Sequence, residues 1–211
     1  MRKPGSVKSL EALGRVRLSK NFFLRDFLYS EVANFYGVPN IPDDPDLAIE
    51  AGSQLCTHLI EPLQATFGRI TIRSGFRSCK VNQLCNEKGH NCATNDKNYA
   101  HHIWDRRDAN GHMGATACIV VNSYIQHYEK TGNWQALAWW IHDHLPYSDL
   151  YFFPKLCAFN ITWHEQPRRR IDSYITPKGT LTKPSMANHE GDHSDLYPDF
   201  HSEIFAHSRQ Y

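Results

Sequence analysis

The longest regular pattern of apolar and polar positions lies between Asp46 and Ala65. Apolar residues recur there at a spacing close to 3.6, which predicts the main core helix, with Asp46 able to cap its N-terminus. Gly68 ends this helix. The β-branched run Ile70-Thr71-Ile72 then predicts a buried strand that ends at Ser74.

Shorter apolar runs predict four more elements, namely strands over 114–121, 150–153 and 158–163 and a helix over 134–142. Residues 79–113 are polar and long for a loop in a compact domain, which is typical of functional or disordered segments. After Arg170 the prolines Pro177, Pro184 and Pro198 break any long element.

These patterns divide the chain into three parts. Residues 1–20 read as a polar arm, residues 21–175 as one domain of mixed helices and strands, and residues 176–211 as an irregular C-terminal extension. A long insertion at 83–113 interrupts the domain. A chain of 211 residues, 41% of them apolar, can build a core of ordinary size.

Composition narrows the function classes. A net charge of +1 gives no electrostatic footprint for nucleic acid, and we expect the single basic run, Arg168-Arg169-Arg170, to be solvated or paired with carboxylates. No segment is long and apolar enough to span a bilayer, and Met1 to Lys20 lacks the apolar core of a secretory signal. We therefore expect a cytoplasmic protein without a membrane partner.

Cysteines and histidines form two clusters along the sequence. In a chain without a signal, the six cysteines are expected to be reduced thiols or metal ligands. Cys79, Cys85, His90 and Cys92 could hold a structural zinc, but their spacing matches none of the standard paired motifs. We expect His189, Asp192 and His193 to be solvated in the polar tail.

Three motifs occur in a distinctive order: Ser74-Gly75-Phe76-Arg77-Ser78, then His101-His102, then Trp163-His164. This order resembles the zinc DD-peptidases of the peptidase M15 family, in their phage and bacterial lysin branch. The resemblance is almost continuous over residues 21–78 and holds in outline beyond them. It implies an α+β fold of the hedgehog/DD-peptidase type, in which a small antiparallel sheet carries a zinc groove and helices cover one face.

The resemblance also implies a set of zinc ligands: a first histidine, an aspartate on the next strand and a final histidine. Aligned in this way, His102, Cys118 and His164 are the ligands, with Cys118 in the place of the aspartate. A thiolate is a good zinc ligand. The alternative is His101 with Asp108, which keeps the seven-residue spacing of the family.

The family's catalytic glutamate has no counterpart on the strand before Trp163. Glu165 and Asp149 are the nearest carboxylates, and His142 or His144 could take over the proton transfer. For substrate binding, the resemblance implies that Arg77 clamps a carboxylate or the oxyanion, helped by Ser74 and Asn82.

The sequence thus predicts a zinc-dependent hydrolase that cleaves amide bonds in peptidoglycan peptides, with phage-lysin-type release as one route to the wall. The alternative is a catalytically inactive M15-like domain that binds a ligand or protein partner through the zinc groove. The missing glutamate and the cysteine at position 118 favour the alternative. The oligomeric state is left open.

Overall fold

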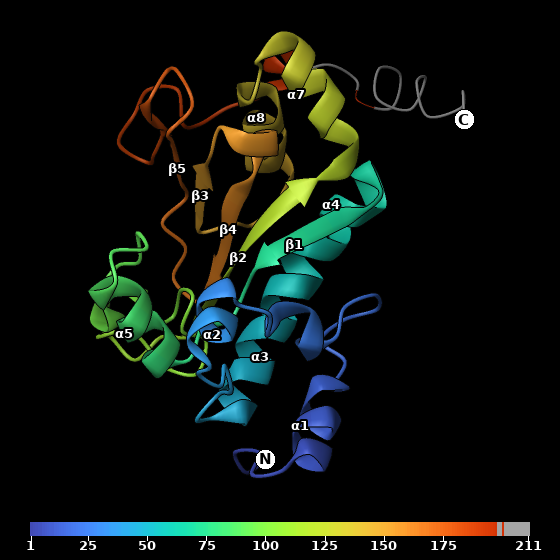
Figure 1. Cartoon of the computed structure of the whole chain (residues 1–211). Coiled ribbons are helices and arrows are strands. Elements are labelled where there is room, and N and C mark those ends of the chain that lie inside the picture. Colours follow the sequence, from blue (N-terminus) through green and yellow to red (C-terminus); the bar gives the residue numbers. More distant parts are fainter. Residues whose placement is uncertain (198–199, 201–211) are drawn as a thin grey trace.

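A six-stranded sheet forms the centre of the computed structural model, which describes residues 1–197 and 200 (Figure 1). The order across the sheet is β1-β2-β4-β3-β5-β6. The bounds are β1 Ile70–Ser74, β2 Gly114–Val121, β3 Asp149–Phe152, β4 Phe159–His164, β5 Arg170–Ser173 and β6 Gly179–Thr182.

The sheet is mixed, so the predicted α+β class is confirmed and the purely antiparallel sheet is wrong. β3 pairs with β5 in parallel, and the other neighbours are antiparallel. The reason is topological. After β4 the chain crosses to the far side of β3 and adds β5 there, so β5 runs in the same direction as β3.

The predicted core helix forms as a continuous unit of α3, a π-helical turn over Cys56–Ile60, and α4, and it packs against β1, β2 and β4. Asp44 caps it, and not Asp46, because Pro45 occupies its first turn, where no backbone N–H is needed. The helices are α1 Val7–Gly14, α2 Glu31–Tyr36, α3 Pro45–Leu55, α4 Glu61–Phe67, α5 Cys79–Glu87, α6 Asn95–Asn98, α7 Ile125–Thr131 and α8 Gln135–His144.

Residues paired across neighbouring strands lie on the same face of the sheet. The two faces that result differ in chemistry. One face carries buried apolar side chains such as Ala117, Ile161 and Leu150, which join the hydrophobic core. The opposite face is polar. Its cross-strand rows are Cys118–Asn160–Tyr151–Asp172, Thr116–Thr162–Asp149–Arg170 and Gly114–His164.

The first twenty residues are part of the fold, which differs from the predicted polar arm. The side chain of Ser6 caps α1, and Leu13 and Leu18 are buried in the core. Their apolar side chains are too few and too far apart to produce a clear period in the sequence.

The insertion also contains unpredicted structure. Ser78 caps α5, and Cys85 at its C-terminal end forms a disulfide with Cys92. This pairing leaves no thiolates at Cys85 and Cys92 for the structural zinc that was considered for Cys79, Cys85, His90 and Cys92, and the expectation of reduced thiols is wrong for the bonded pair. His90 instead contacts the Tyr36 hydroxyl at 3.0 Å.

Beyond Arg170 the chain forms β5 and β6, so the predicted irregular tail is wrong for these residues. The following segment packs on α8. Part of the predicted extension, including Pro198, lies outside the described residues. Within the described part of the chain, no helix has the length and hydropathy needed to cross a membrane.

Candidate functional site

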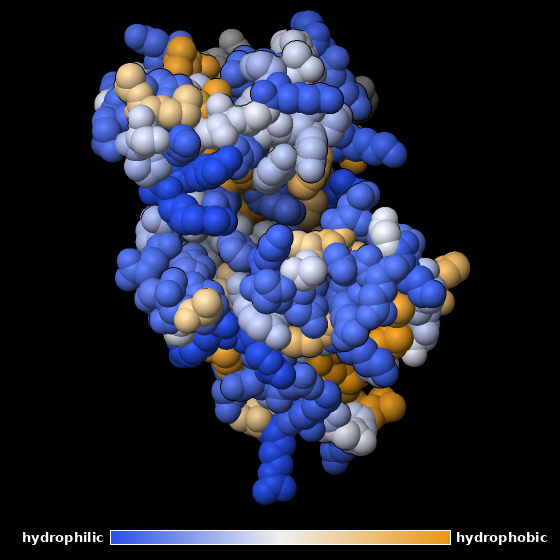
Figure 2. Space-filling view, turned by 90° about the vertical axis from the view of Figure 1, so that its left-hand side faces the viewer, coloured by the Kyte–Doolittle hydropathy of each residue, from blue (hydrophilic) through white to orange (hydrophobic). Residues whose placement is uncertain are grey.

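Two adjoining pockets lie on the polar face of the sheet and share His101 and Arg168 as walls. The first also contains Asp108, His112 and His164. The second extends across the strands along Asp149, Tyr151, Asn160 and Asp172. The side of the molecule that bears α5 and β5 is largely hydrophilic and is hollowed across its middle (Figure 2).

The first pocket brings together His101, Asp108 and His164. The Asp108 Oδ2 atom lies 3.3 Å from His164 Nε2, and the rings of His101 and His164 stack with centroids 6.2 Å apart. Ligand atoms about 2.1 Å from a tetrahedral zinc lie roughly 3.4 Å apart. The Asp108–His164 separation therefore fits two ligands of one metal ion.

The local backbone fixes each of these side chains. His164 ends β4 opposite Gly114, and a Cβ on Gly114 would come within 2.2 Å of the Ala100 carbonyl oxygen and 2.7 Å of His164 Cδ2. Ala100 has a left-handed φ of 57°, and the His101 carbonyl accepts a hydrogen bond from Thr116 N at 3.0 Å. A glycine in β2 thus lets the histidine loop and His164 approach one another.

Asp108 is held in a tight turn. The backbone N–H groups of Asn110 and His112 each donate to Asp108 Oδ1 at 2.9 Å, which leaves Oδ2 facing His164. Burial opposes ionisation, but these two donors keep the pKa of Asp108 below its usual range. Burial also lowers the pKa of His101, which favours the neutral imidazole that a metal requires.

His164 has the backbone partner that a ligating histidine needs. Its Nδ1 lies 3.0 Å from both the carbonyl oxygen and the N–H of Gln166. With Nδ1 accepting from the Gln166 N–H, Nε2–H faces the Asp108 carboxylate; only the other tautomer, in which Nδ1–H donates to the Gln166 carbonyl, leaves the Nε2 lone pair free for a metal ion. A backbone carbonyl that orients the second nitrogen is a common feature of metal-binding histidines.

The structure does not bring the first-choice ligands together. Cys118 pairs with Asn160, four residues from His164, which is about 13 Å along the strand. The His102 ring is buried, with Nδ1 2.9 Å from the Gly75 carbonyl oxygen, and burial lowers its pKa well below the usual value. The alternative pair, His101 and Asp108, is the one that lies beside His164.

The predicted substrate-binding residues lie outside both pockets. Arg77 is partly buried, and its Nη1 donates to Cys92 Sγ at 3.1 Å. Ser74 lies opposite Cys118 at the end of β1. Asn82 is fully buried and joins α5 to α6 through Asn95 and Asn98, which is a structural role.

Of the predicted proton-transfer residues, Glu165 is engaged elsewhere. Its carboxylate accepts from Met113 N at 2.7 Å and pairs with Arg107 at 3.5 Å, so it closes the loop that carries Asp108. Asp149, in contrast, lines the second pocket next to His101. Arg168 holds it in a bidentate ion pair with distances of 2.9 and 3.1 Å.

The basic run is paired as expected. Arg168 and Arg170 bind Asp149 and Asp172, and Arg169 donates to the carbonyls of His142 and Leu145 at the end of α8.

His142 belongs to a second group, with Asp143 and His193, whose ligand atoms lie within 4.8 Å of one another and could hold a metal ion. Its Nδ1 is 2.6 Å from the Tyr147 hydroxyl and its Nε2 2.9 Å from the His189 carbonyl oxygen. His193 likewise contacts Asp143 and the Asn188 carbonyl. A metal ion would have to replace these hydrogen bonds.

His193 and His189 are buried, so the expectation of solvated histidines is wrong for these two.

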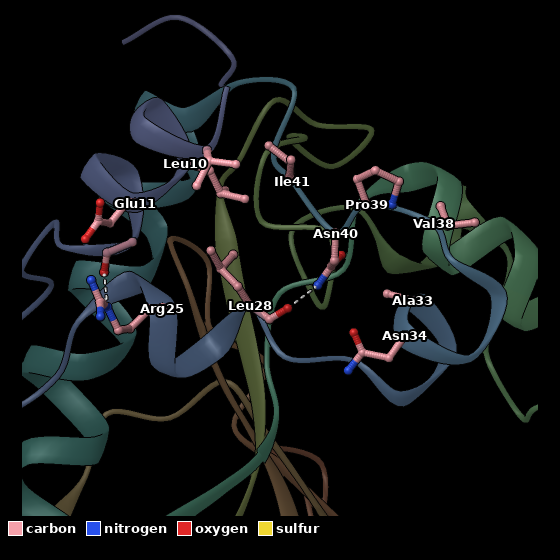
Figure 3. A pocket seen from close by; sticks show the side chains of 12 residues that line it. Leu10, Glu11, Arg25, Leu28, Ala33, Asn34, Val38, Pro39, Asn40 and Ile41 are labelled. Carbon is pink, nitrogen blue, oxygen red and sulfur yellow. Dashed lines mark hydrogen bonds between the residues drawn. The ribbon is translucent and has the colours of Figure 1, made fainter. Parts of the chain in front are cut away.

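A further pocket lies between α1 and α2 (Figure 3). It is lined largely by apolar side chains, including Leu10, Leu28 and Ile41. Asn40 crosses it to donate to the Leu28 carbonyl at 3.0 Å. It contains no cluster of catalytic or metal-binding side chains.

The site could have been located from the sequence more closely than the first-choice alignment did. The seven-residue spacing from His101 to Asp108 is the sequence signal that points to this pocket. Comparison with family models, with curated proteins and with solved structures finds no match to this chain.

Proposed function

We propose that the chain is a zinc-dependent hydrolase of the peptidase M15 type that cleaves amide bonds in peptidoglycan peptides. The observation that carries the proposal is the 3.3 Å separation of Asp108 Oδ2 and His164 Nε2 in a pocket shared with His101. The resemblance of the motif order to that of peptidase M15 supplies the reaction class, which is amide-bond hydrolysis. Asp108 and His164 would hold the ion, and the His101 ring, whose centroid lies 6.2 Å from that of His164, would have to move closer to become the third ligand.

A zinc ion with three protein ligands and an open position acidifies a bound water and polarises a carbonyl. The residues of the chain would do the remaining work. Asp149 is the carboxylate in the groove beside His101 and is the candidate to accept a proton. Arg168 fixes its orientation and adds positive charge to the wall that both pockets share.

A binding function without catalysis is the second candidate. It is favoured by the ion pair between Asp149 and Arg168, because that pair engages both oxygens of the nearest groove carboxylate. In that case the groove would hold a metal and a peptide without turnover.

Metal analysis of the purified protein tests the proposal. After removal of metal and reloading with zinc, we expect about one ion per chain. His164→Ala and Asp108→Ala should lose most of it, because each removes one of the two side chains whose ligand atoms lie 3.3 Å apart. Cys118→Ser is the matched control on the same face of the sheet, and His193→Ala reports the second His-Asp-His group.

Zinc loss in Cys118→Ser with retention in Asp108→Ala would contradict the assignment. Release of new amino groups from peptidoglycan by the zinc-loaded protein, and not by His164→Ala, would then separate the hydrolase from the binding domain.

A further inference from the structure

Three aromatic side chains gather on the polar face at the far end of the groove. The ring centroids of Tyr151 and Tyr174 are 4.8 Å apart, and Phe153 lies 5.6 Å from Tyr151 and 5.9 Å from Tyr174. Tyr174 is 54% exposed. We call this cluster of Tyr151, Phe153 and Tyr174 the aromatic platform.

The platform continues the groove. Tyr151 lines the second pocket and faces the same side as Asn160 and Asp172, its neighbours in one cross-strand row. Asn160 is four residues from His164, so the platform begins about 13 Å from the candidate metal ligands. An extended peptide of about four residues covers that distance.

The charged groups beside the platform, Arg170 and Asp172, form an ion pair. Arg170 binds Asp172 through two contacts of 2.6 and 2.9 Å, and Thr180 donates to the same carboxylate at 2.7 Å. A charged ligand would have to break this bidentate pair. A neutral ligand with many hydroxyl groups could instead add hydrogen bonds to fixed donors and acceptors.

Exposed tyrosine rings offer an apolar surface with a polar edge. Three rings are too small an area for a stable protein interface, which buries about 800 Å² on each partner. A pyranose ring has an apolar face and hydroxyl edges that match such a surface.

We propose that the aromatic platform is a saccharide-binding subsite, which takes the glycan end of a sugar-linked peptide whose amide bond reaches the metal pocket. The inference of a saccharide site depends only on the aromatic platform and its polar neighbours. The statement that the sugar and the cleaved peptide belong to one substrate rests on the proposed function.

The test uses the full chain and a tetramer of β-1,4-linked N-acetylglucosamine as the probe, with binding measured by calorimetry. We expect saturable binding that Tyr174→Ala weakens at least tenfold and Tyr174→Phe largely keeps. Phe35→Ala is the matched control, because Phe35 is 82% exposed on α2 and lies on another element. Tyr174 is exposed, so its variants should fold, and their melting temperatures check this.

His164→Ala separates the two proposals, since it should lose zinc and keep the affinity for the tetramer. No saturable binding by the native protein, or equal binding by the native, Tyr174→Ala and Phe35→Ala proteins, would overturn the saccharide site. If the tetramer binds as expected but peptides linked to a glycan are cleaved no better than free peptides, the sugar and the scissile bond do not belong to one substrate.

Discussion

Gly114 is the residue on which the geometry of the candidate site depends most directly. A methyl group there would overlap the Ala100 carbonyl and the His164 ring. We expect Gly114→Ala to lose about 1–3 kcal/mol of unfolding free energy and most of the zinc that the proposed function predicts, because either the loop or the ring must move. Gly5→Ala is the control, since nothing lies within 4 Å of its added Cβ. Normal zinc content in Gly114→Ala would show that the site tolerates this displacement.

Glu61 provides a pH-dependent test at the same scale. Its carboxylate accepts hydrogen bonds from Ser19 Oγ and from the backbone and side-chain nitrogens of Asn21, at 2.6–2.7 Å. Burial opposes ionisation, but these bonds lower the pKa of Glu61 below its usual 4.5. The contribution to stability is therefore present above pH 4.5 and is lost as the pH falls through the folded-state pKa.

We expect Glu61→Ala to unfold with about 1–3 kcal/mol less free energy at pH 7. The difference from the native protein should shrink toward pH 3. Urea unfolding at both pH values measures it, and a difference that does not depend on pH would mean that the ionised form is not the one that stabilises the fold.

At the scale of elements, α5 and α6 are joined by buried amides. Asn82 donates to Asn95 Oδ1 and the Ala93 carbonyl and accepts from Asn98, at 2.9–3.0 Å. Asn82→Ala should cost about 2–3 kcal/mol, because it leaves buried partners unsatisfied. Gln83→Ala, a substitution at the exposed neighbouring position, should cost only a few tenths of the free energy lost in Asn82→Ala. Thermal unfolding compares them, and loss of activity at unchanged stability would restore the predicted substrate role of Asn82.

The elements that the sequence predicts are those with their own periodic apolar pattern, such as α3 and β2. α5 is not predicted because it buries only Val81, Asn82 and Cys85, and β5 and β6 are not predicted because each contains a single apolar residue, Ile171 or Leu181. Their formation depends on pairing with distant strands. The choice between His101 and His102 depends on how the loop folds back on β2, and adjacent residues there point to different environments.

At the scale of the whole molecule, the C-terminal segment is held on α8 by a hydrogen-bonded cluster. His193 Nδ1 lies 2.7 Å from Asp143 Oδ1, the Tyr197 hydroxyl donates to Asp143 at 3.0 Å, and the His193 ring stacks on Trp139. His142 adds a bond from Nε2 to the His189 carbonyl. The segment after β6 therefore completes the fold, and we expect the stability of the chain to depend on the protonation of His142.

His142 makes that dependence testable. Burial lowers its pKa below the usual 6.5; the hydrogen bond to the His189 carbonyl opposes this, and nearby Arg169 acts in the same direction as burial. The unfolded chain thus takes up a proton before the folded chain does. The stabilisation is present above pH 6.5 and is lost as the pH falls through the folded-state pKa.

We therefore expect the melting temperature of the chelator-treated protein to fall between pH 7 and pH 5. His142→Gln should flatten this slope, whereas His58→Gln, at an exposed position on the π-helical turn, should leave it unchanged. The two variants differ from the native chain by the same substitution, so a general effect of losing one histidine cancels between them. Equal slopes in both variants would mean that other groups control the response to acid and that the cluster on α8 stays intact when His142 is charged.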